Sequence, residues 1–200
     1  MSGRRACARA RLATMATLVA LVTLAAGRPL AAQTSIAVSP FTPLGFFGIG
    51  VERVTAPRRS VRTDLTGSLW RSIGATPAQF ALLTHEWRYH RRAPGEGPYL
   101  ALDVGVHGFR VRKWDHRGTD RFQEGFGAHG GGSVGYEHPL GGRWTLDLFA
   151  GGGTMQSLYK GYEASTGSRY DGARGWNRSG ELVPYRMGVM LSHGLRRGSQ

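Results

Sequence analysis

The chain has one cysteine, Cys7, and it lies near the start of the sequence. If export removes that part, the mature protein has no cysteine, which excludes disulfide bonds, thiolate metal sites and cysteine nucleophiles. Cys7 also precedes the longest apolar stretch, whereas the cysteine of a lipoprotein follows it. We therefore expect no lipid anchor at this residue.

The chain also lacks an apolar run long enough to cross a membrane as a helix. Its longest run covers 12–26 and has 15 residues, against about 20 for a spanning helix. Basic residues and no acid precede it: Arg4, Arg5, Arg9 and Arg11. A basic start, a short apolar stretch and small residues after it are typical of a signal peptide. We predict a signal peptide over 1–32, cleaved after Ala32 or, alternatively, after Gly27; an uncleaved anchor is the other interpretation.

Acidic residues are few, and the net charge of +13 with a pI of about 11.1 suggests nucleic-acid binding at first. Removal of 1–32 takes away five of the 26 Lys and Arg and none of the 13 Asp and Glu, so the charge falls to +8. Export also separates the chain from nucleic acid, and the surplus forms no long basic run. We expect it to contact anionic lipid head groups of the outer membrane instead.

Sustained helical periodicity is missing as well, and alternation of apolar and polar residues takes its place. Such alternation indicates strands with two different faces. Eight segments show it: 33–39, 46–54, 61–69, 79–90, 99–112, 126–137, 144–160 and 182–195. The window 76–83 also fits the start of a short helix capped by Thr76. We predict one all-β domain over 33–200, an eight-stranded antiparallel up-and-down β-barrel of the membrane type, after a cleavable N-terminal signal helix.

The polar face of these segments combines carboxylates with Arg and His, and has no Lys before Lys160. Arg is preferred where planar pairing with carboxylates occurs away from bulk water. The interior of an eight-stranded barrel is just wide enough for side chains to fill it. We therefore predict a polar network that plugs the barrel, formed by Glu52, Arg62, Asp64, Glu86, Arg88, His90, Asp103, His107, His129, Glu137, Asp147 and Arg186.

Aromatic residues and loop lengths favour a membrane location. Rings gather near strand ends, as they do at membrane interfaces: Trp70, Trp87, Tyr89, Trp114, Tyr136 and Trp144. The connections alternate between short inner turns and longer outer loops. We expect inner turns near 55–60, 91–98 and 138–142, and outer loops near 40–45, 71–78, 113–121 and 161–181. The loops 113–121 and 161–181 are the surface that we expect to be available to an extracellular partner.

Three sequence motifs suggest chemistry, and none meets its structural requirement. In HEWRYH, His85 and His90 are five residues apart and point to opposite faces of a strand, so they do not form a zinc-protease pair. GFGAHG over 125–130 matches a dinucleotide fingerprint, but no helix follows it. Ser192 and His193 face opposite ways on a strand, so no Ser–His pair suits lipid chemistry. We predict no catalytic residues, no cofactor and no metal.

The chain carries a set of glycine-aromatic motifs over most of its mature length. They are EWRY over 86–89, GGGSVGYE over 130–137, LGGRWTLD over 140–147, GGG over 151–153, Tyr159, Tyr162 and PYRMGV over 184–189, with a weaker counterpart in PLG over 43–45 and GVE over 50–52. With them the sequence resembles an uncharacterised family of bacterial outer-membrane β-barrel proteins, catalogued as a domain of unknown function. The resemblance implies the barrel fold and the location, and it carries no catalytic residues.

The predicted function is that of a non-enzymatic outer-membrane β-barrel protein of a Gram-negative cell. Its expected partners are outer-membrane lipid and the barrel-assembly machinery, although the chain ends on 196–200 without the terminal aromatic that many such barrels have. Two alternatives remain: a soluble, lipocalin-like barrel of the periplasm that binds a small apolar ligand, and an outer-membrane enzyme that modifies lipid. The second alternative requires a Ser–His–acid cluster within hydrogen-bond reach.

Overall fold

The computed structural model describes residues 33–68, 70, 72–73, 76–113, 116, 118–170 and 175–195, and no side chains over 72–77. The predicted signal peptide and Trp114 lie outside these residues. The elements are β1 (Thr34–Val38), a 3₁₀ turn η1 (Thr42–Leu44), β2 (Phe46–Ala56), β3 (Arg59–Ser68), β4 (Ser72–Ile73), β5 (Thr76–His90), β6 (Gly97–Val111), β7 (Arg121–Gly141), β8 (Trp144–Glu163) and β9 (Asn177–Gly194). Among the described residues, no helix is long and apolar enough to cross a membrane.

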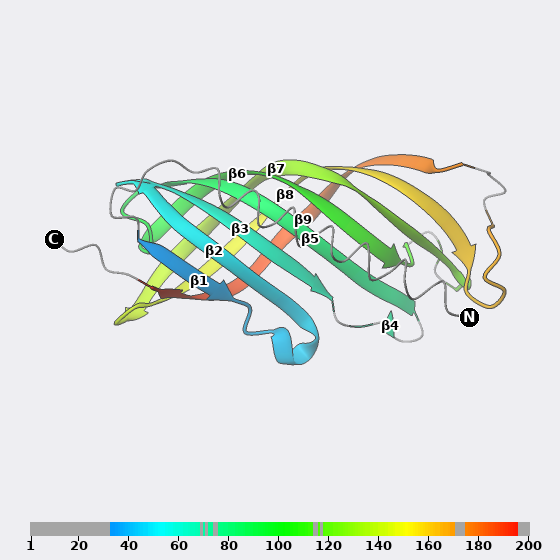
Figure 1. The fold of residues 1–200 in the computed structure, drawn as a ribbon, viewed down its shortest axis with the longest axis horizontal. Coiled ribbons are helices and arrows are strands. Elements are labelled where there is room, and N and C mark those ends of the chain that lie inside the picture. The colour runs from blue at the N-terminus through cyan, green and yellow to red at the C-terminus, as the bar shows by residue number, and fades with distance from the viewer. Residues whose placement is uncertain are drawn as a thin grey trace. The chain divides into compact units, whose positions relative to one another are not determined.

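Eight antiparallel strands form a closed hydrogen-bonded ring (Figure 1). Each strand pairs with its neighbours in sequence, β3 pairs with β5, and β1 pairs with β9 to close the ring. The two-residue strand β4 pairs only with the start of β5. The eight alternating segments of the sequence correspond to the eight strands of the ring, which confirms the all-β prediction.

The short helix considered for 76–83 is wrong, because these residues begin the strand β5. From Ala78 onward β5 pairs with β6 in an unbroken register that ends at His90 and Tyr99. The alternation of Phe80 and Leu82 with their neighbours fits this pairing better than the helical turn that Thr76 could cap. Tertiary pairing therefore overrides the local helix signal.

The two faces of the strands differ sharply in chemistry. The inner face buries charged and polar side chains, and the outer face exposes large aliphatic ones. On β6, for example, Leu102 is 70% exposed, while its neighbour Asp103 is 2% exposed. The apolar side chains are therefore directed away from the ring interior, which is the reverse of a soluble protein with an apolar core.

One part of β9 departs from the predicted alternation. Regular alternation of the segment 182–195 predicts Val183 and Tyr185 on the outer face with Met187, but Val183 lines an inner cavity and the hydroxyl of Tyr185 donates to Asp103. The register between β8 and β9 shifts at this point, with two residues of β9 opposite one of β8. Pro184 is one of the two, and proline cannot donate a ladder hydrogen bond. The result is a β-bulge that reverses the alternation.

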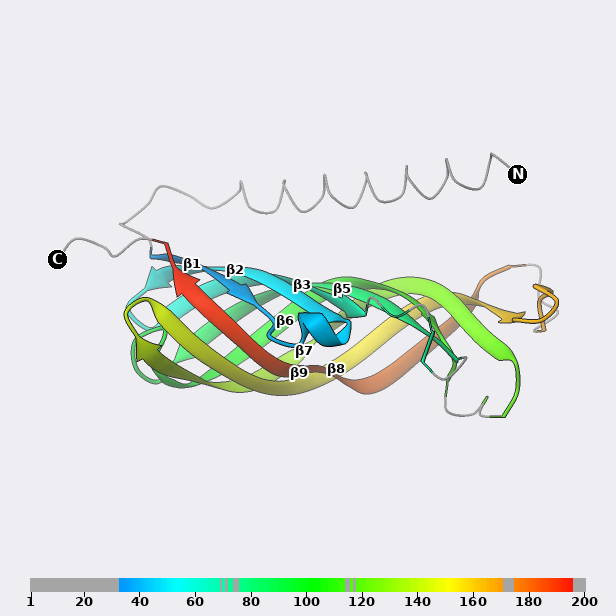
Figure 2. The same ribbon diagram turned by 90° about the horizontal axis from the view of Figure 1, so that it is seen from below.

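The two ends of the ring differ in the length of their connections. Two-residue and six-residue connections join β2 to β3 and β5 to β6, and a tight turn joins β7 to β8. At the opposite end β7, β8 and β9 extend well past the ends of β1 and β2 (Figure 2). With 21 and 20 residues, β7 and β8 are about twice as long as a membrane crossing requires. The ring is therefore tallest where β7, β8 and β9 lead to the long outer loops.

Candidate functional site

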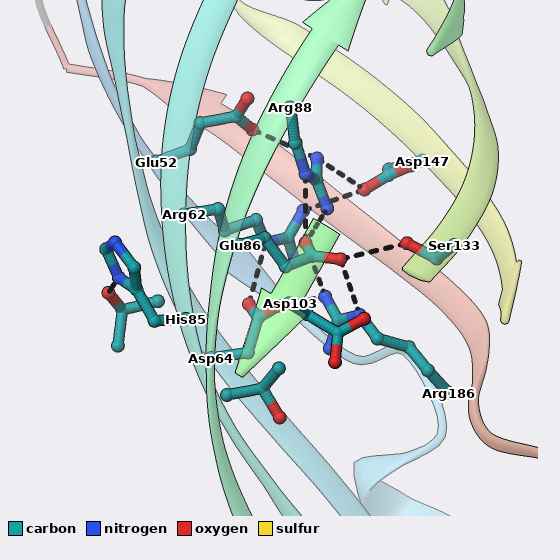
Figure 3. Close-up of polar contacts among 12 residues, drawn as sticks. Glu52, Arg62, Asp64, His85, Glu86, Arg88, Asp103, Ser133, Asp147 and Arg186 are labelled. Carbon is teal, nitrogen blue, oxygen red and sulfur yellow. Dashed lines mark hydrogen bonds and ion pairs between the residues drawn. The ribbon is translucent and has the colours of Figure 1, made fainter. Parts of the chain in front are cut away.

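A network of charged side chains crosses the inside of the ring near the end with the short turns (Figure 3). The strands β2, β3, β5, β7, β8 and β9 each contribute to it. It consists of three arginines, five carboxylates and one histidine: Arg62, Arg88, Arg186, Glu52, Asp64, Glu86, Glu137, Asp147 and His90. All of these side chains are buried.

Arg88 is the centre of this network. Its guanidinium reaches four carboxylates, at 2.8 Å from Glu86, 3.1 Å from Asp147, 3.3 Å from Glu52 and 3.4 Å from Glu137. The guanidinium also lies 4.4 Å from the ring centre of Tyr99, whose hydroxyl donates to Asp147 at 2.9 Å. Arg88 therefore has both charge partners and an aromatic surface, which is the environment in which Arg tolerates burial.

The other two arginines link opposite walls of the ring. Arg62 on β3 donates to Asp64 at 2.7 Å and across the interior to Asp147 on β8 at 2.7 Å. Arg186 on β9 reaches Asp64 at 2.5 Å and Glu86 on β5 at 2.7 Å. These contacts join strands that share no backbone hydrogen bonds, so the network holds the walls at a fixed separation.

A serine, a histidine and two glutamates form a series of contacts at the lower edge of the network, by which we mean the edge nearest the short turns. Ser60 Oγ lies 2.8 Å from His90 Nε2 and 2.5 Å from Glu52 Oε1, and His90 Nδ1 lies 3.3 Å from Glu137 Oε2. The N–H of Gly95, at a left-handed φ of +93°, donates to Glu137 at 2.6 Å. Sequence reasoning missed this Ser–His–acid arrangement, because Ser60 and His90 are 30 residues apart.

A second polar group lies farther from the short turns. His129 Nε2 is 3.1 Å from Thr84 Oγ1, and His107 Nε2 is 2.9 Å from Ser157 Oγ. The two imidazole rings are 5.7 Å apart. Their Nδ1 atoms are buried and have no hydrogen-bond partner within the described part of the chain.

The structure thus divides the twelve predicted interior residues into two sets. Nine belong to the charged network, while Asp103, His107 and His129 lie apart from it and bond to Tyr185, Ser157 and Thr84. Tyr99 and Ser133 join the network although the prediction left them out. Their position was visible in the sequence, since both follow the alternation that places Asp103 and Glu137 inside.

His85 lies on the outer face of β5, away from the network (Figure 3). Its Nδ1 is 2.9 Å from Thr63 Oγ1, so His85 and His90 point to opposite sides of the strand. Within the described residues no group of three or more His, Cys, Asp or Glu is placed to hold a metal ion.

The predicted interface aromatics point outward wherever the structure describes them. Trp87, Tyr89, Tyr136 and Trp144 surround the end with the short turns, and each exposes about half of its surface. Trp70 lies near the other end, where its indole N–H donates to Leu44 O at 2.7 Å. Trp176 was not predicted; it packs edge-on against Phe126, with Lys160 over its ring.

One contact between the two long outer loops is made by Tyr170. The hydroxyl of Tyr170, from the loop predicted over 161–181, lies 3.0 Å from Nε2 of His116, from the loop predicted over 113–121. Gln123 Nε2 donates to the same hydroxyl at 3.2 Å. The two loops therefore meet at Tyr170, and we treat their described residues as one outer surface.

A second contact between these loops centres on Asp120. The backbone N–H of Ser165 donates to its carboxylate at 2.9 Å, and the N–H of Ala164 donates to its carbonyl at 2.9 Å. Hydrogen bonds from the hydroxyl and the backbone of Ser165 lower the pKa of the Asp120 carboxyl. Lys113, two residues after the end of β6, forms an ion pair with Glu181 on β9.

Comparison with known proteins gives a family and no more specific relative. The model of a family described as "Protein of unknown function (DUF3575)" matches residues 13–192. Neither the curated proteins nor the solved structures give a match.

Proposed function

The chain belongs to the DUF3575 family of proteins of unknown function, and from the distribution of its side chains we propose that it is a non-enzymatic β-barrel protein of the bacterial outer membrane. In this proposal residues 1–32 are a signal peptide that is removed on export, and the barrel-assembly machinery inserts the rest. The charged network plugs the barrel, and the outer loops present a surface to an extracellular partner. The location in the periplasm is the alternative.

The outward direction of the apolar side chains is the observation that carries the proposal. Exposed aliphatic residues occur on β1, β2, β6, β7, β8 and β9, and aromatic residues flank them toward the short turns. Monomeric soluble proteins rarely expose contiguous apolar patches larger than a few hundred Å². A barrel with an apolar outer band, aromatic girdles and a polar interior has the composition that a bilayer requires.

The same arrangement speaks against a lipocalin-like barrel. A soluble barrel that binds an apolar ligand needs an apolar interior and a polar exterior. Here the interior holds Arg62, Arg88 and Glu86, all nearly inaccessible to solvent. Leu100 and Leu102 face outward instead, with exposed fractions of 62% and 70%.

The membrane proposal is tested by the behaviour of the full chain expressed in a Gram-negative host. We expect a product lacking residues 1–32 in the outer-membrane fraction. Its electrophoretic mobility should shift on boiling, because a hydrogen-bonded ring resists unheated detergent. A product that is released with the periplasmic contents and has one mobility before and after boiling would contradict the proposal.

An enzymatic role is the second candidate, because Ser60, His90 and Glu137 have the sequence of contacts found in hydrolytic triads. The hydroxyl of Ser60, however, has one hydrogen, and Glu52 competes for it at 2.5 Å. When Glu52 is ionised, its carboxylate can only accept, so that Ser60 donates to Glu52 and accepts from His90 Nε2. A histidine that donates to the serine is not its base, which favours a structural role.

A serine-reactive fluorophosphonate probe separates the two roles. The non-enzymatic proposal expects no labelling of the folded protein, and equal backgrounds for wild type and Ser60→Ala. Labelling that Ser60→Ala and His90→Gln abolish, while Ser133→Ala retains it, would establish the enzymatic candidate. Ser133 is a suitable control because it is also buried and bonded to a carboxylate, at 3.0 Å from Glu86.

A further inference from the structure

Among the described residues, the ring is closed beside β9 only near the end with the short turns. β1 ends at Val38, and its pairing with β9 covers only Leu191–Gly194 of that strand. In the described part of the chain, the stretch of β9 from 178 to 190 has β8 as its one paired strand, with a bulge at Pro184 and Tyr185. Figure 2 shows the β1–β2 hairpin, in blue, ending partway along β9, in red to orange.

An unpaired strand edge is costly at the depth of a membrane. Backbone N–H and C=O groups without partners are strongly unfavourable in hydrocarbon, and such backbone is tolerated where it is buried in protein or lines a cavity. A cavity of about 320 Å³ does lie here, bounded by Phe46 and Phe47 of β2 and by Met187 and Met190 of β9. Met187 is 66% exposed on the outer face, so this cavity reaches the outer surface of the ring.

The cavity beside β9 adjoins another one inside the ring. A second cavity, of about 730 Å³, occupies the outer half of the ring above the charged network. Phe80, Leu82 and Tyr185 line both cavities. The walls of the upper one are largely apolar and include Phe109 and Met155. Its size and lining lie within the range of binding sites for small molecules.

The upper cavity has a cationic end at its outer mouth. Arg112 and Lys113 line it there, with Glu181 as the acid in the lining. Glu181 is paired with Lys113, so Arg112 carries the surplus positive charge of the lining. The Nε of Arg112 is buried and lacks a hydrogen-bond partner among the described residues. Asp120, whose carboxyl feels the charge of Arg112, lies outside the cavity lining.

From these features we infer that the ring binds one molecule of a single-chain anionic amphiphile, which enters from the membrane beside β9. The hydrocarbon chain occupies the apolar space at Phe80, Leu82 and Phe109, and the anionic group pairs with Arg112. The charged network closes the lower end, so the ligand does not pass through to the other side. The entry route rests on the proposed membrane location, whereas the two cavities do not.

Binding of palmitate to the purified protein in lipid nanodiscs tests the inference, with a fluorescent fatty acid as the displaced reporter. We expect saturable binding at one site per ring, absent from empty nanodiscs. Arg112→Gln should weaken palmitate binding about tenfold, because a charge-assisted hydrogen bond is lost, and leave palmityl alcohol unaffected. Arg110→Gln is the matched control, since Arg110 is exposed, stacks on Phe122 and lies outside the lining of the cavity.

Further variants and ligands locate the hydrocarbon chain of the bound molecule and identify the source of its anionic group. Leu82→Trp should abolish binding by filling the junction of the cavities, and Met187→Trp should slow association more than it changes affinity. A lysophospholipid arm tests whether the anionic group is a carboxylate or a phosphodiester. Equal affinity of wild type, Arg112→Gln and Leu82→Trp would overturn the inference, as would equal binding of palmityl alcohol and palmitate to the wild type.

The experiment also distinguishes failure of this inference from failure of the membrane proposal. Every variant is first checked for a heat-dependent mobility shift. A wild-type protein that shows the shift and does not bind palmitate contradicts the ligand site alone. A wild-type protein that binds palmitate without entering a membrane contradicts the membrane proposal and the entry route. The ligand site in the cavity is then still supported.

Discussion

Arg186 on β9 pairs across the ring with two carboxylates on the neighbouring strands β3 and β5, and neither contact is exposed to water. Removal of one partner from a buried ion pair costs about 3–5 kcal/mol, because the remaining charge stays buried without compensation. We therefore predict that Arg186→Ala lowers the free energy of unfolding of the refolded ring by about that amount. Denaturant titration in detergent micelles measures it.

Arg92→Ala is the control for this experiment. Arg92 pairs with Glu96 in the β5–β6 connection, and 67% and 52% of the two side chains are exposed. An exposed pair contributes little, at most about 1 kcal/mol. If Arg186→Ala and Arg92→Ala have the same small effect, the network does not stabilise the ring.

Glycine positions explain how large aromatic side chains fit inside the narrow ring of strands. A Cβ on Gly135 would overlap the ring of Tyr99, and one on Gly188 would come within 3.1 Å of Phe149. Phe149 in turn lies under the guanidinium of Arg186, at 4.9 Å. The absence of side chains at these glycines therefore makes room for the aromatic surfaces that two buried arginines pack on.

At the scale of the strand, the sequence predicted which residues face inward but not which partners they find. Alternation is a property of one strand, so it placed Arg62 and Asp147 inside. Their contact joins residues 85 positions apart and depends on the diameter and stagger of the closed ring, which no single strand encodes. Ser60 and His90 were missed as a pair for the same reason.

The outer face of β6 offers a direct test of the membrane proposal. A cationic side chain on the lipid face of a barrel costs about 2–4 kcal/mol at the bilayer midplane and about 0–1 kcal/mol near the interface. Leu102→Arg should therefore destabilise the ring in vesicles far more than Leu140→Arg, which lies at the β7–β8 turn. Both side chains are more than half exposed, so on a soluble protein both changes would be nearly neutral.

Unfolding from lipid vesicles, followed by the loss of tryptophan fluorescence, gives both values. If the Leu102→Arg protein is as stable as the wild type, the outer face of β6 lies in water and the membrane proposal is contradicted.

The bulge at Pro184 limits what alternation can predict within β9. The pattern gave Val183 an outward direction, whereas the structure turns it inward and leaves Leu182 87% exposed. The mature chain contains no cysteine of its own if 1–32 is removed, so single cysteines report each position cleanly. We predict that a spin label at Leu182→Cys is accessible to oxygen in the lipid, and that one at Val183→Cys is not.

Met187→Cys serves as a second outward reference below the bulge, because Met187 is 66% exposed. Equal oxygen accessibility at 182 and 183 would mean that the alternation does not reverse there. A higher value at 183 than at 182 would restore the regular pattern that the sequence predicted.

At the scale of the whole molecule, the ring is open in its outer half and closed by charge in its lower half. The side chains that close it come from six strands, and the contacts of Arg62 and Arg186 run from wall to wall. Ion conduction needs a continuous water path, and the network residues leave almost no accessible surface along it. We therefore predict that the wild-type protein produces no conductance steps in a planar bilayer.

The double variant Arg62→Ala/Asp147→Ala should open such a path. It removes one cation and one anion, so the net charge of the network is unchanged, and replacing both members of a buried pair avoids the large cost of an unpaired charge. We expect brief conductance steps from this variant and none from Arg92→Ala/Glu96→Ala, which removes an exposed pair. Steady conductance steps from the wild type would show that water passes the network. A double variant without conductance would assign the seal to other side chains, first of all Tyr99 and Arg88, which both contact Asp147.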